Sequence, residues 1–139
     1  MVLNKEELAL GYRSSIIQKK EWIVTQAQFL LKEGNIEEIR QTLDELQKKR
    51  KEKQPLEYPS AGSTFKRPEG YFAGKLIEDA GLRGYRVGDI MVSDKHCGFV
   101  VNVGNGTAKE VHELIQYVEQ TVYDKFGVKL EPEVRFLGE

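Results

Sequence analysis

The chain of 139 residues carries a formal net charge of −1, and 40% of its residues are hydrophobic and 31% charged. This length suits one domain with a remnant of a second, and the near-neutral charge excludes a strong field toward nucleic acid or a membrane. The single cysteine, Cys97, excludes an internal disulfide and fits a reducing cytoplasm, where we expect it to be a small buried residue in a strand.

The N-terminal region has no signal-peptide pattern, and no apolar run approaches the roughly 20 residues that span a bilayer. Residues 1–15 lack a strong hydrophobic period, and Tyr12 and Arg13 lie there between Gly11 and two serines. A lone arginine of this kind is most often a solvated surface residue. From residue 22 to 31 two sets of side chains alternate, which predicts a β-strand with one partly wet face that ends before Gly34.

A helix is expected next, because Asn35 and Glu38 have the spacing of a capping box. Apolar residues then recur at helical spacing, at Ile36, Ile39, Leu43 and Leu46. The helix ends in cations within residues 48–53, which complement the negative end of its dipole. They are expected to be mostly solvated, with a phosphate contact from one of them as the alternative. The cluster is short, is flanked by acids and lacks aromatic residues for base stacking, so no nucleic-acid partner is expected.

Residues 58–68 (YPSAGSTFKRP) have the composition of a loop, with two prolines around a run of small residues. Gly62 permits backbone angles that a side chain forbids, or lets a ligand come close. Ser63 follows it, and Lys66 and Arg67 come shortly after. A hydroxyl followed by two cations can hold a phosphorylated or carboxylated ligand. From these residues alone an ordinary solvated turn is the favoured interpretation.

The next stretch is predicted to hold a helix over residues 71–80, which Gly81 ends, and then a loop over residues 82–88. Two short strands, residues 90–92 and 98–103, form a hairpin. His96 lies in its turn, where no constellation of cysteines or carboxylates supports a catalytic or metal-binding role, so we expect it to be solvated.

A long helix follows, because Thr107 and Glu110 form a second capping box and Gly127 is a natural end. Its apolar stripe is expected to be core and comprises Val111, Leu114, Ile115, Val118 and Val122. His112 lies on or near the polar face of this helix and needs no role.

The C-terminal stretch, residues 130–137, is predicted to be a strand. Its period of two places Val134 and Phe136 on one face and Glu133 and Arg135 on the other. Glu133 and Arg135 are then either a solvated ion pair or a pair directed into a cleft. The residues alone leave these two interpretations equally supported.

Three of these stretches, in order, resemble the UDP-N-acetylenolpyruvoylglucosamine reductase family. Residues 11–15 (GYRSS) resemble its Tyr-Arg motif, residues 58–68 its serine loop, and residues 131–138 (EPEVRFLG) its C-terminal glutamate strand. Residues 72–77 and 98–102 are also similar, so the resemblance covers nearly the whole chain. Family members are much longer than this sequence, and their N-terminal half carries the flavin-binding domain.

The resemblance therefore implies that this sequence is the C-terminal part of such a reductase. Residues 1–33 would be a remnant of the flavin-binding domain, and residues 34–139 the substrate-binding domain. Together with the element pattern, this predicts an α+β fold in which two long helices and one short helix pack on a small, mostly antiparallel sheet.

The function implied by the resemblance is that of an NADPH-dependent flavoenzyme of peptidoglycan precursor synthesis, which reduces UDP-N-acetylglucosamine enolpyruvate to UDP-N-acetylmuramate. FAD would be bound mainly by the missing N-terminal half, in cis. The alternative is a free-standing, non-catalytic module that binds a sugar nucleotide or a partner protein.

The residue roles carried by the resemblance are those of an acid, a charge-stabilising pair and a set of substrate contacts. Arg13 and Glu133 would stabilise the enolate formed from the substrate, and Ser63 would donate a proton. The substrate contacts would be Tyr12, Gly62, Lys66 and Arg67, together with Lys51 or Lys53 at the diphosphate, a choice that the spacing leaves open. No metal ligand is expected.

Overall fold

The computed structural model describes residues 1–137, and the chain separates into two compact units, Met1–Ile36 and Glu37–Glu139. In the first unit the N-terminal residues make a tight turn and the short helix α1, Ile16–Lys19. The prediction of a strand over residues 22–31 is wrong, because this stretch has no regular secondary structure and its side chains are exposed. Alternation alone does not make a strand, since the N–H and C=O groups of a strand need a partner strand.

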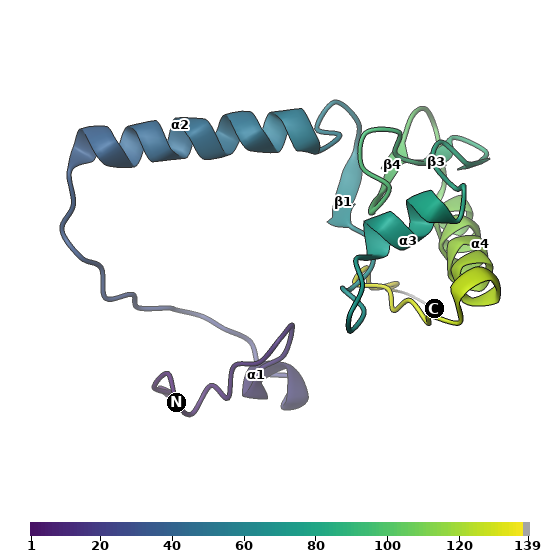
Figure 1. Ribbon diagram of the computed structural model, residues 1–139. Coiled ribbons are helices and arrows are strands. Elements are labelled where there is room, and N and C mark those ends of the chain that lie inside the picture. Colours follow the sequence, from purple (N-terminus) through teal and green to yellow (C-terminus); the bar gives the residue numbers. More distant parts are fainter. Residues whose placement is uncertain (138–139) are drawn as a thin grey trace. The chain divides into compact units, whose positions relative to one another are not determined.

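The second unit has an α+β fold, which confirms the predicted class (Figure 1). Four strands of the described residues form one sheet in the order β1-β4-β3-β2, and each neighbouring pair is antiparallel. The elements in chain order are α2 (Ile36–Lys53), β1 (Ser60–Ser63), α3 (Ala73–Asp79), β2 (Arg86–Val87), β3 (Ile90–Val92), β4 (Phe99–Asn102) and α4 (Ala108–Phe126).

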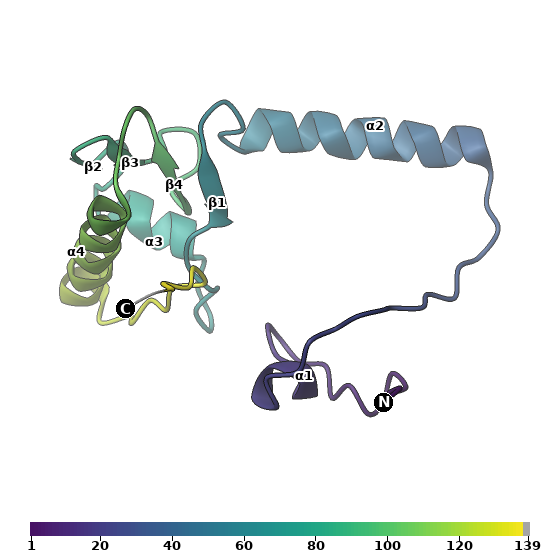
Figure 2. The ribbon, with the colours of Figure 1, turned by 180° about the vertical axis from the view of Figure 1, so that it is seen from behind.

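The core lies where α3 and α4 pack together against the sheet, as both ribbon views show (Figures 1 and 2). The predicted stripe of α4 is confirmed as core, since Leu114, Ile115, Val118 and Val122 are fully buried. Burying each such side chain contributes about 1.5–3 kcal/mol. This compact core fixes the sheet on which the candidate site is built.

The ends of α4 follow the local signals of the sequence. The Thr107 hydroxyl accepts the N–H of Glu110 at 3.3 Å, and the Glu110 carboxylate accepts the N–H of Thr107 at 2.6 Å, so the capping box is present. At the other end Gly127 takes a positive φ of 67°, and its N–H donates to Tyr123 O at 2.7 Å. This left-handed conformation is the reason for a glycine there.

The helix α2 differs from expectation, because it buries none of its residues. Its apolar stripe is half or more exposed, from Ile39 at 50% to Ile36 at 67%. The prediction that this helix packs on the sheet is therefore wrong for the described residues.

Three further segments depart from the predicted secondary structure. Residues 60–63 were expected to be loop but form β1, and residues 86–87 lie in a predicted loop but form β2. The last predicted strand shrinks to a single bridge between Pro132 and Phe65, because the N–H of Thr64, which would continue the ladder to Glu133, donates to Gly98 O instead. Gly138, which ends the C-terminal motif, lies outside the described residues.

Candidate functional site

The strand β1 contains a bulge at Gly62. Ser60 pairs with Val101 and Ser63 with Phe99, so β1 has one residue more than β4 between the two pairs. Gly62 has a φ of +92°, and a Cβ built there would meet nothing within 4 Å. Its need for glycine is therefore conformational rather than steric.

The bulge at Gly62 places Ser63 at the surface. The Ser63 side chain is exposed, and its hydroxyl makes one long contact of 3.4 Å to the carbonyl of Phe65. The Ser60 hydroxyl accepts the N–H of Gly62 at 3.1 Å and donates to Val100 O at 3.0 Å, which fixes the start of the bulge. The Ser63 hydroxyl is thus accessible on a backbone held to the sheet.

Directly after β1 the chain pairs with the C-terminal segment. The N–H of Glu133 donates to Thr64 O at 2.8 Å, and the N–H of Lys66 donates to Glu131 O at 2.9 Å. Because Glu133 bonds the residue next to Ser63, the structure brings these two predicted site residues to neighbouring positions, although they are 70 positions apart in the sequence.

Thr64 joins this pair of segments to the sheet, and sequence reasoning did not identify it. Thr64 is 2% exposed; its N–H donates to Gly98 O at 2.8 Å and its hydroxyl accepts the N–H of Val100 at 3.0 Å. The Thr64 hydroxyl oxygen therefore takes the place of a backbone acceptor toward β4, while the Thr64 carbonyl accepts the N–H of Glu133 on the other side. A threonine beside the exposed serine was the available signal, but its partners are set by tertiary structure.

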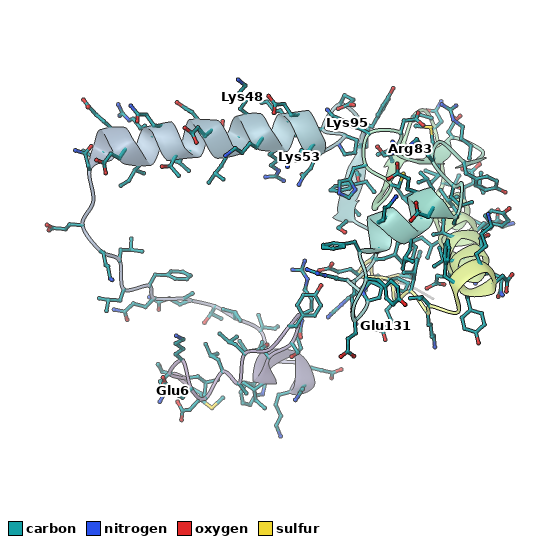
Figure 3. The ribbon with its side chains drawn as sticks, viewed as in Figure 1. Glu6, Lys48, Lys53, Arg83, Lys95 and Glu131 are labelled. Carbon is teal, nitrogen blue, oxygen red and sulfur yellow. The ribbon has the colours of Figure 1, made fainter. Side chains whose placement is uncertain are left out.

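Lys66 is directed to a carboxylate. Its ammonium lies 3.0 Å from Oε2 of Glu131, whose position at the edge of the second unit is labelled in Figure 3. The hydrogen bond and charge of Lys66 lower the pKa of the Glu131 carboxyl below its ordinary value. The pair reinforces the contact between the two segments, and a ligand that used Lys66 would compete with Glu131.

Arg67 is held over an aromatic ring. Its guanidinium carbon lies 4.0 Å from the centroid of the Phe72 ring, and its Nε donates to Tyr71 O at 3.3 Å. Stacking of this kind restricts the side chain and holds the positive charge of the guanidinium in one place.

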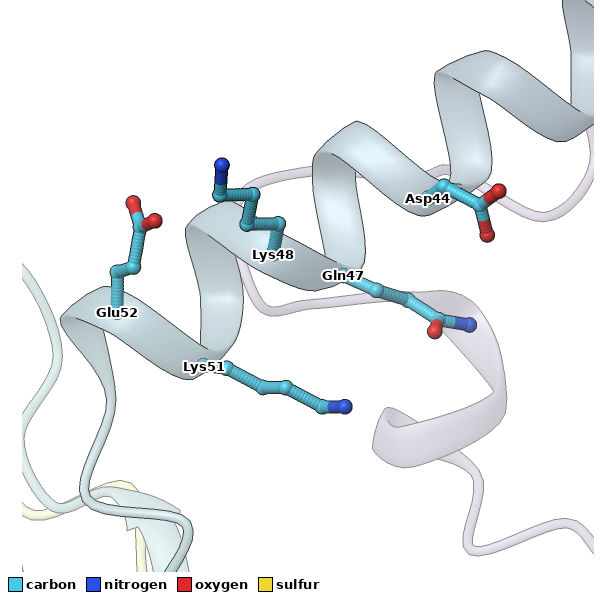
Figure 4. Close-up of a pocket in the computed structure, with 5 residues that line it drawn as sticks. All are labelled: Asp44, Gln47, Lys48, Lys51 and Glu52. Atoms are coloured by element: carbon cyan, nitrogen blue, oxygen red, sulfur yellow. The ribbon is translucent and has the colours of Figure 1, made fainter.

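The two lysines proposed for phosphate contact lie near the end of α2. They are on different faces, because side chains two positions apart in a helix are separated by about 200° around its axis. Lys51 lines an open hollow of about 420 Å³ together with Asp44, Gln47, Lys48 and Glu52 (Figure 4). Two cations and two carboxylates share this hollow, so its charge does not favour an anion by itself. Lys53 extends from the helix on the side away from Lys48 (Figure 3).

Tyr12 and Arg13 belong to the first unit, where they form the tip of a tight turn. The turn is closed by hydrogen bonds of 3.0 and 3.3 Å between Gly11 and Ser14. Arg13 has a positive φ of 51°, an uncommon value for a residue with a side chain, and its guanidinium lies 5.8 Å from the Tyr12 ring centroid. Strained backbone of this kind often occurs at ligand sites.

The two histidines and the cysteine make contacts that support the fold. The exposed His96 accepts the N–H of Gly98 on Nδ1 at 3.0 Å, and the ring centroid of the half-buried His112 lies 4.7 Å from that of Phe136. Cys97 is buried as expected, although in the turn of the hairpin rather than in a strand, and burial raises its pKa. Among residues 1–137 no three His, Cys, Asp or Glu side chains gather as a metal site requires. The helices in this range are all too short or too polar to cross a bilayer.

Comparison with known proteins points in one direction. The family model for the C-terminal domain of UDP-N-acetylenolpyruvoylglucosamine reductase matches residues 54–137. The reductase of Lachnoclostridium phytofermentans is 69% identical over 137 residues, which are 99% of this chain and 44% of that protein. The reductase of Caldanaerobacter subterraneus subsp. tengcongensis is 56% identical over 139 residues, 100% of this chain and 46% of that protein.

A solved structure agrees with these relatives. The crystal structure of UDP-N-acetylenolpyruvylglucosamine reductase from Thermus caldophilus superposes with a TM-score of 0.79 at 42% identity, over 94% of this chain and 46% of that one. The chain thus spans less than half the length of the relatives that it matches.

Proposed function

Since the chain belongs to the family of the C-terminal domain of UDP-N-acetylenolpyruvoylglucosamine reductase, we propose that it is the substrate-binding part of such an oxidoreductase. The reaction would reduce UDP-N-acetylglucosamine enolpyruvate to UDP-N-acetylmuramate for peptidoglycan synthesis in the cytoplasm. The observation that carries this proposal is the pairing of residues 64–66 with residues 131–133, which makes Ser63 and Glu133 neighbours.

FAD and NADPH are the redox cofactors of the proposed enzyme. The residues described here do not fit a flavin dinucleotide of the common kind, whose phosphates lie on a glycine-rich loop between a parallel strand and a helix. The strand pairs among residues 1–137 are antiparallel, and none provides that unit. As the resemblance implies, we assign FAD mainly to the N-terminal half of such an enzyme.

In the proposed reaction, this chain supplies the proton. Reduction of the enolpyruvyl double bond adds a hydride equivalent to one carbon and a proton to its neighbour, with an enolate in between. The hydride is cofactor chemistry. Ser63 donates the proton from its exposed hydroxyl to the enolate carbon, and its oxygen regains a proton from solvent. A serine is a weak acid, so this role needs the fixed position that the bulge at Gly62 provides.

Arg13 and Glu133 are the residues proposed to stabilise the negative charge of the enolate. The guanidinium of Arg13 stays protonated and can bind the substrate carboxylate through two hydrogen bonds, which lowers the energy of the enolate. Glu133 shares this task from its position beside Ser63. The backbone bond from Glu133 to Thr64 supports the proposal, because it fixes the glutamate beside the acid.

The remaining residues bind the substrate. Tyr12 accompanies Arg13 at the turn, Gly62 lets the ligand approach the backbone, and Arg67 faces the diphosphate from its place over Phe72. Lys66 contributes charge next to Arg67 while it stays paired with Glu131. Lys51 or Lys53 completes the diphosphate contacts from the end of α2.

A hybrid enzyme tests the proposal against a non-catalytic binding module. The matching region of the Lachnoclostridium phytofermentans reductase is replaced by this chain, which is 69% identical to it. We expect the purified hybrid to consume NADPH only when the enolpyruvyl substrate is present, and to lose this activity with Ser63→Ala. A hybrid that binds flavin and the UDP sugar but never turns over would instead identify this chain as a binding module.

A further inference from the structure

The last turn of α2 contains a carbonyl that the helix cannot satisfy by itself. In an α-helix the C=O of residue 51 accepts from the N–H of residue 55. That residue is Pro55, which has no N–H. The preceding carbonyl is normal, since Arg50 O accepts the N–H of Gln54 at 2.9 Å. Pro55 thus ends α2 and leaves the Lys51 carbonyl without its helical donor.

Lys95 supplies the missing donor. Its ammonium donates to Lys51 O at 2.7 Å and lies 3.5 Å from Oε2 of Glu57. The two residues are 44 positions apart. A positive charge at this end of a helix is also favourable, because the carbonyls there carry the negative end of the dipole.

The turn that carries Lys95 is itself fixed. The hydroxyl of Ser93, which is 2% exposed, accepts the N–H groups of Lys95 and His96 at 3.2 and 3.3 Å. Because α2 buries no residue, packing of its side chains does not set its position. The contact from Lys95 therefore connects the exposed helix to the β3–β4 hairpin.

We infer that Lys95 is a positioning residue, which fixes the last turn of α2 and with it the side chains proposed to contact the substrate diphosphate, Lys51 and Lys53. The ligand part of this inference rests on the proposed function. The structural part rests only on the contacts of Lys95. The two parts can fail separately.

Three variants of this chain test the inference. Lys95→Met removes the ammonium and keeps most of the stem, whereas Lys95→Arg keeps a cationic donor. Lys49→Met is the matched control, because Lys49 is an exposed lysine of α2 that lies 3.9 Å from Glu45 and has no proposed role. Each variant is studied by amide hydrogen exchange and by calorimetric titration with UDP-N-acetylglucosamine.

We expect Lys95→Met to speed exchange of the amides of Lys53 and Gln54 by about three- to tenfold, the effect of losing one hydrogen bond at a helix end. The dissociation constant for UDP-N-acetylglucosamine should rise by a similar factor. Lys95→Arg and Lys49→Met should stay within about twofold of the parent in both measurements, since neither loses the contact to Lys51 O.

The outcomes separate the two parts. Unchanged exchange in Lys95→Met overturns the positioning role, whatever the binding data show. Faster exchange with unchanged affinity overturns the link to the ligand. Absence of binding by the parent chain refutes the proposed substrate contacts and leaves exchange to decide on Lys95.

A second substitution distinguishes loss of this contact from a general loss of stability. Pro55→Ala restores an N–H at position 55, so the Lys51 carbonyl gains a donor within the helix. In this background Lys95→Met should have a smaller effect on exchange than in the parent. Equal effects in both backgrounds would mean that Lys95 does not act through the Lys51 carbonyl.

Discussion

The need for glycine at position 62 makes the bulge beside Ser63 a quantitative test of the site. Gly62 has a φ of +92°, and an added Cβ would meet no atom within 4 Å. Replacing it with alanine therefore costs the energy of holding an L-residue at positive φ, about 1–2 kcal/mol, with no steric clash added. For a unit of this size the midpoint of thermal unfolding should fall by about 4–8 °C per kcal/mol.

The measurement is denaturant and thermal unfolding of the parent, Gly62→Ala and Gly62→Asn. Asparagine tolerates positive φ better than alanine, so Gly62→Asn should lose less stability although its side chain is larger. A cost below about 0.3 kcal/mol for alanine would refute the positive φ. An asparagine variant as unstable as the alanine variant would show that space, rather than backbone angle, limits this position.

Three further predictions concern the acid, an ion pair and the core. In an active hybrid enzyme, Ser63→Ala should lower kcat by about 10²–10⁴-fold with little change in KM, measured by steady-state kinetics; a change confined to KM would make Ser63 a binding residue. The pKa of Glu131 is lowered by Lys66, so the pair stabilises the fold above the ordinary pKa of 4.5 and this contribution is lost as pH falls through the lowered value. Glu131→Gln should therefore flatten the dependence of the unfolding midpoint on pH below 4.5, and an unchanged profile would show that the pair adds nothing. Leu114→Ala, at a fully buried position, should cost about 2–5 kcal/mol in denaturant unfolding. Leu43→Ala, on the exposed stripe of α2, should cost about 0.5–1 kcal/mol at most, and a larger loss would mean that this helix packs.

Elements that depend on residues close together in the chain were predictable from the sequence. The limits of α4 follow from the capping box of Thr107 and from Gly127, and its core face from the spacing of its apolar residues. The hairpin of β3 and β4 was also predicted, because its two strands are close in the chain. The family was predicted from three short motifs in order, and the match over residues 54–137 confirms it.

Features that depend on distant partners were decided only by the tertiary structure. Residues 60–63 look like a loop and become a strand because the edge of β4 supplies their hydrogen-bond partners. Residues 22–31 look like a strand and are not one in the structure. The roles of Thr64 and Lys95 were likewise invisible, because each side chain bonds a backbone group 36 or 44 positions away. The roles proposed for the site residues remain predictions.

The physical reason lies in where hydrogen bonds are formed. A helix satisfies its backbone within four residues, so capping residues and apolar spacing are enough to define it. A strand, a bulge or a helix end stopped by proline needs donors and acceptors from elsewhere in the chain. The sequence alone therefore determined the three longer helices and the family of this protein, whereas only tertiary pairing made Ser63 a neighbour of Glu133 and brought Lys95 to the end of α2.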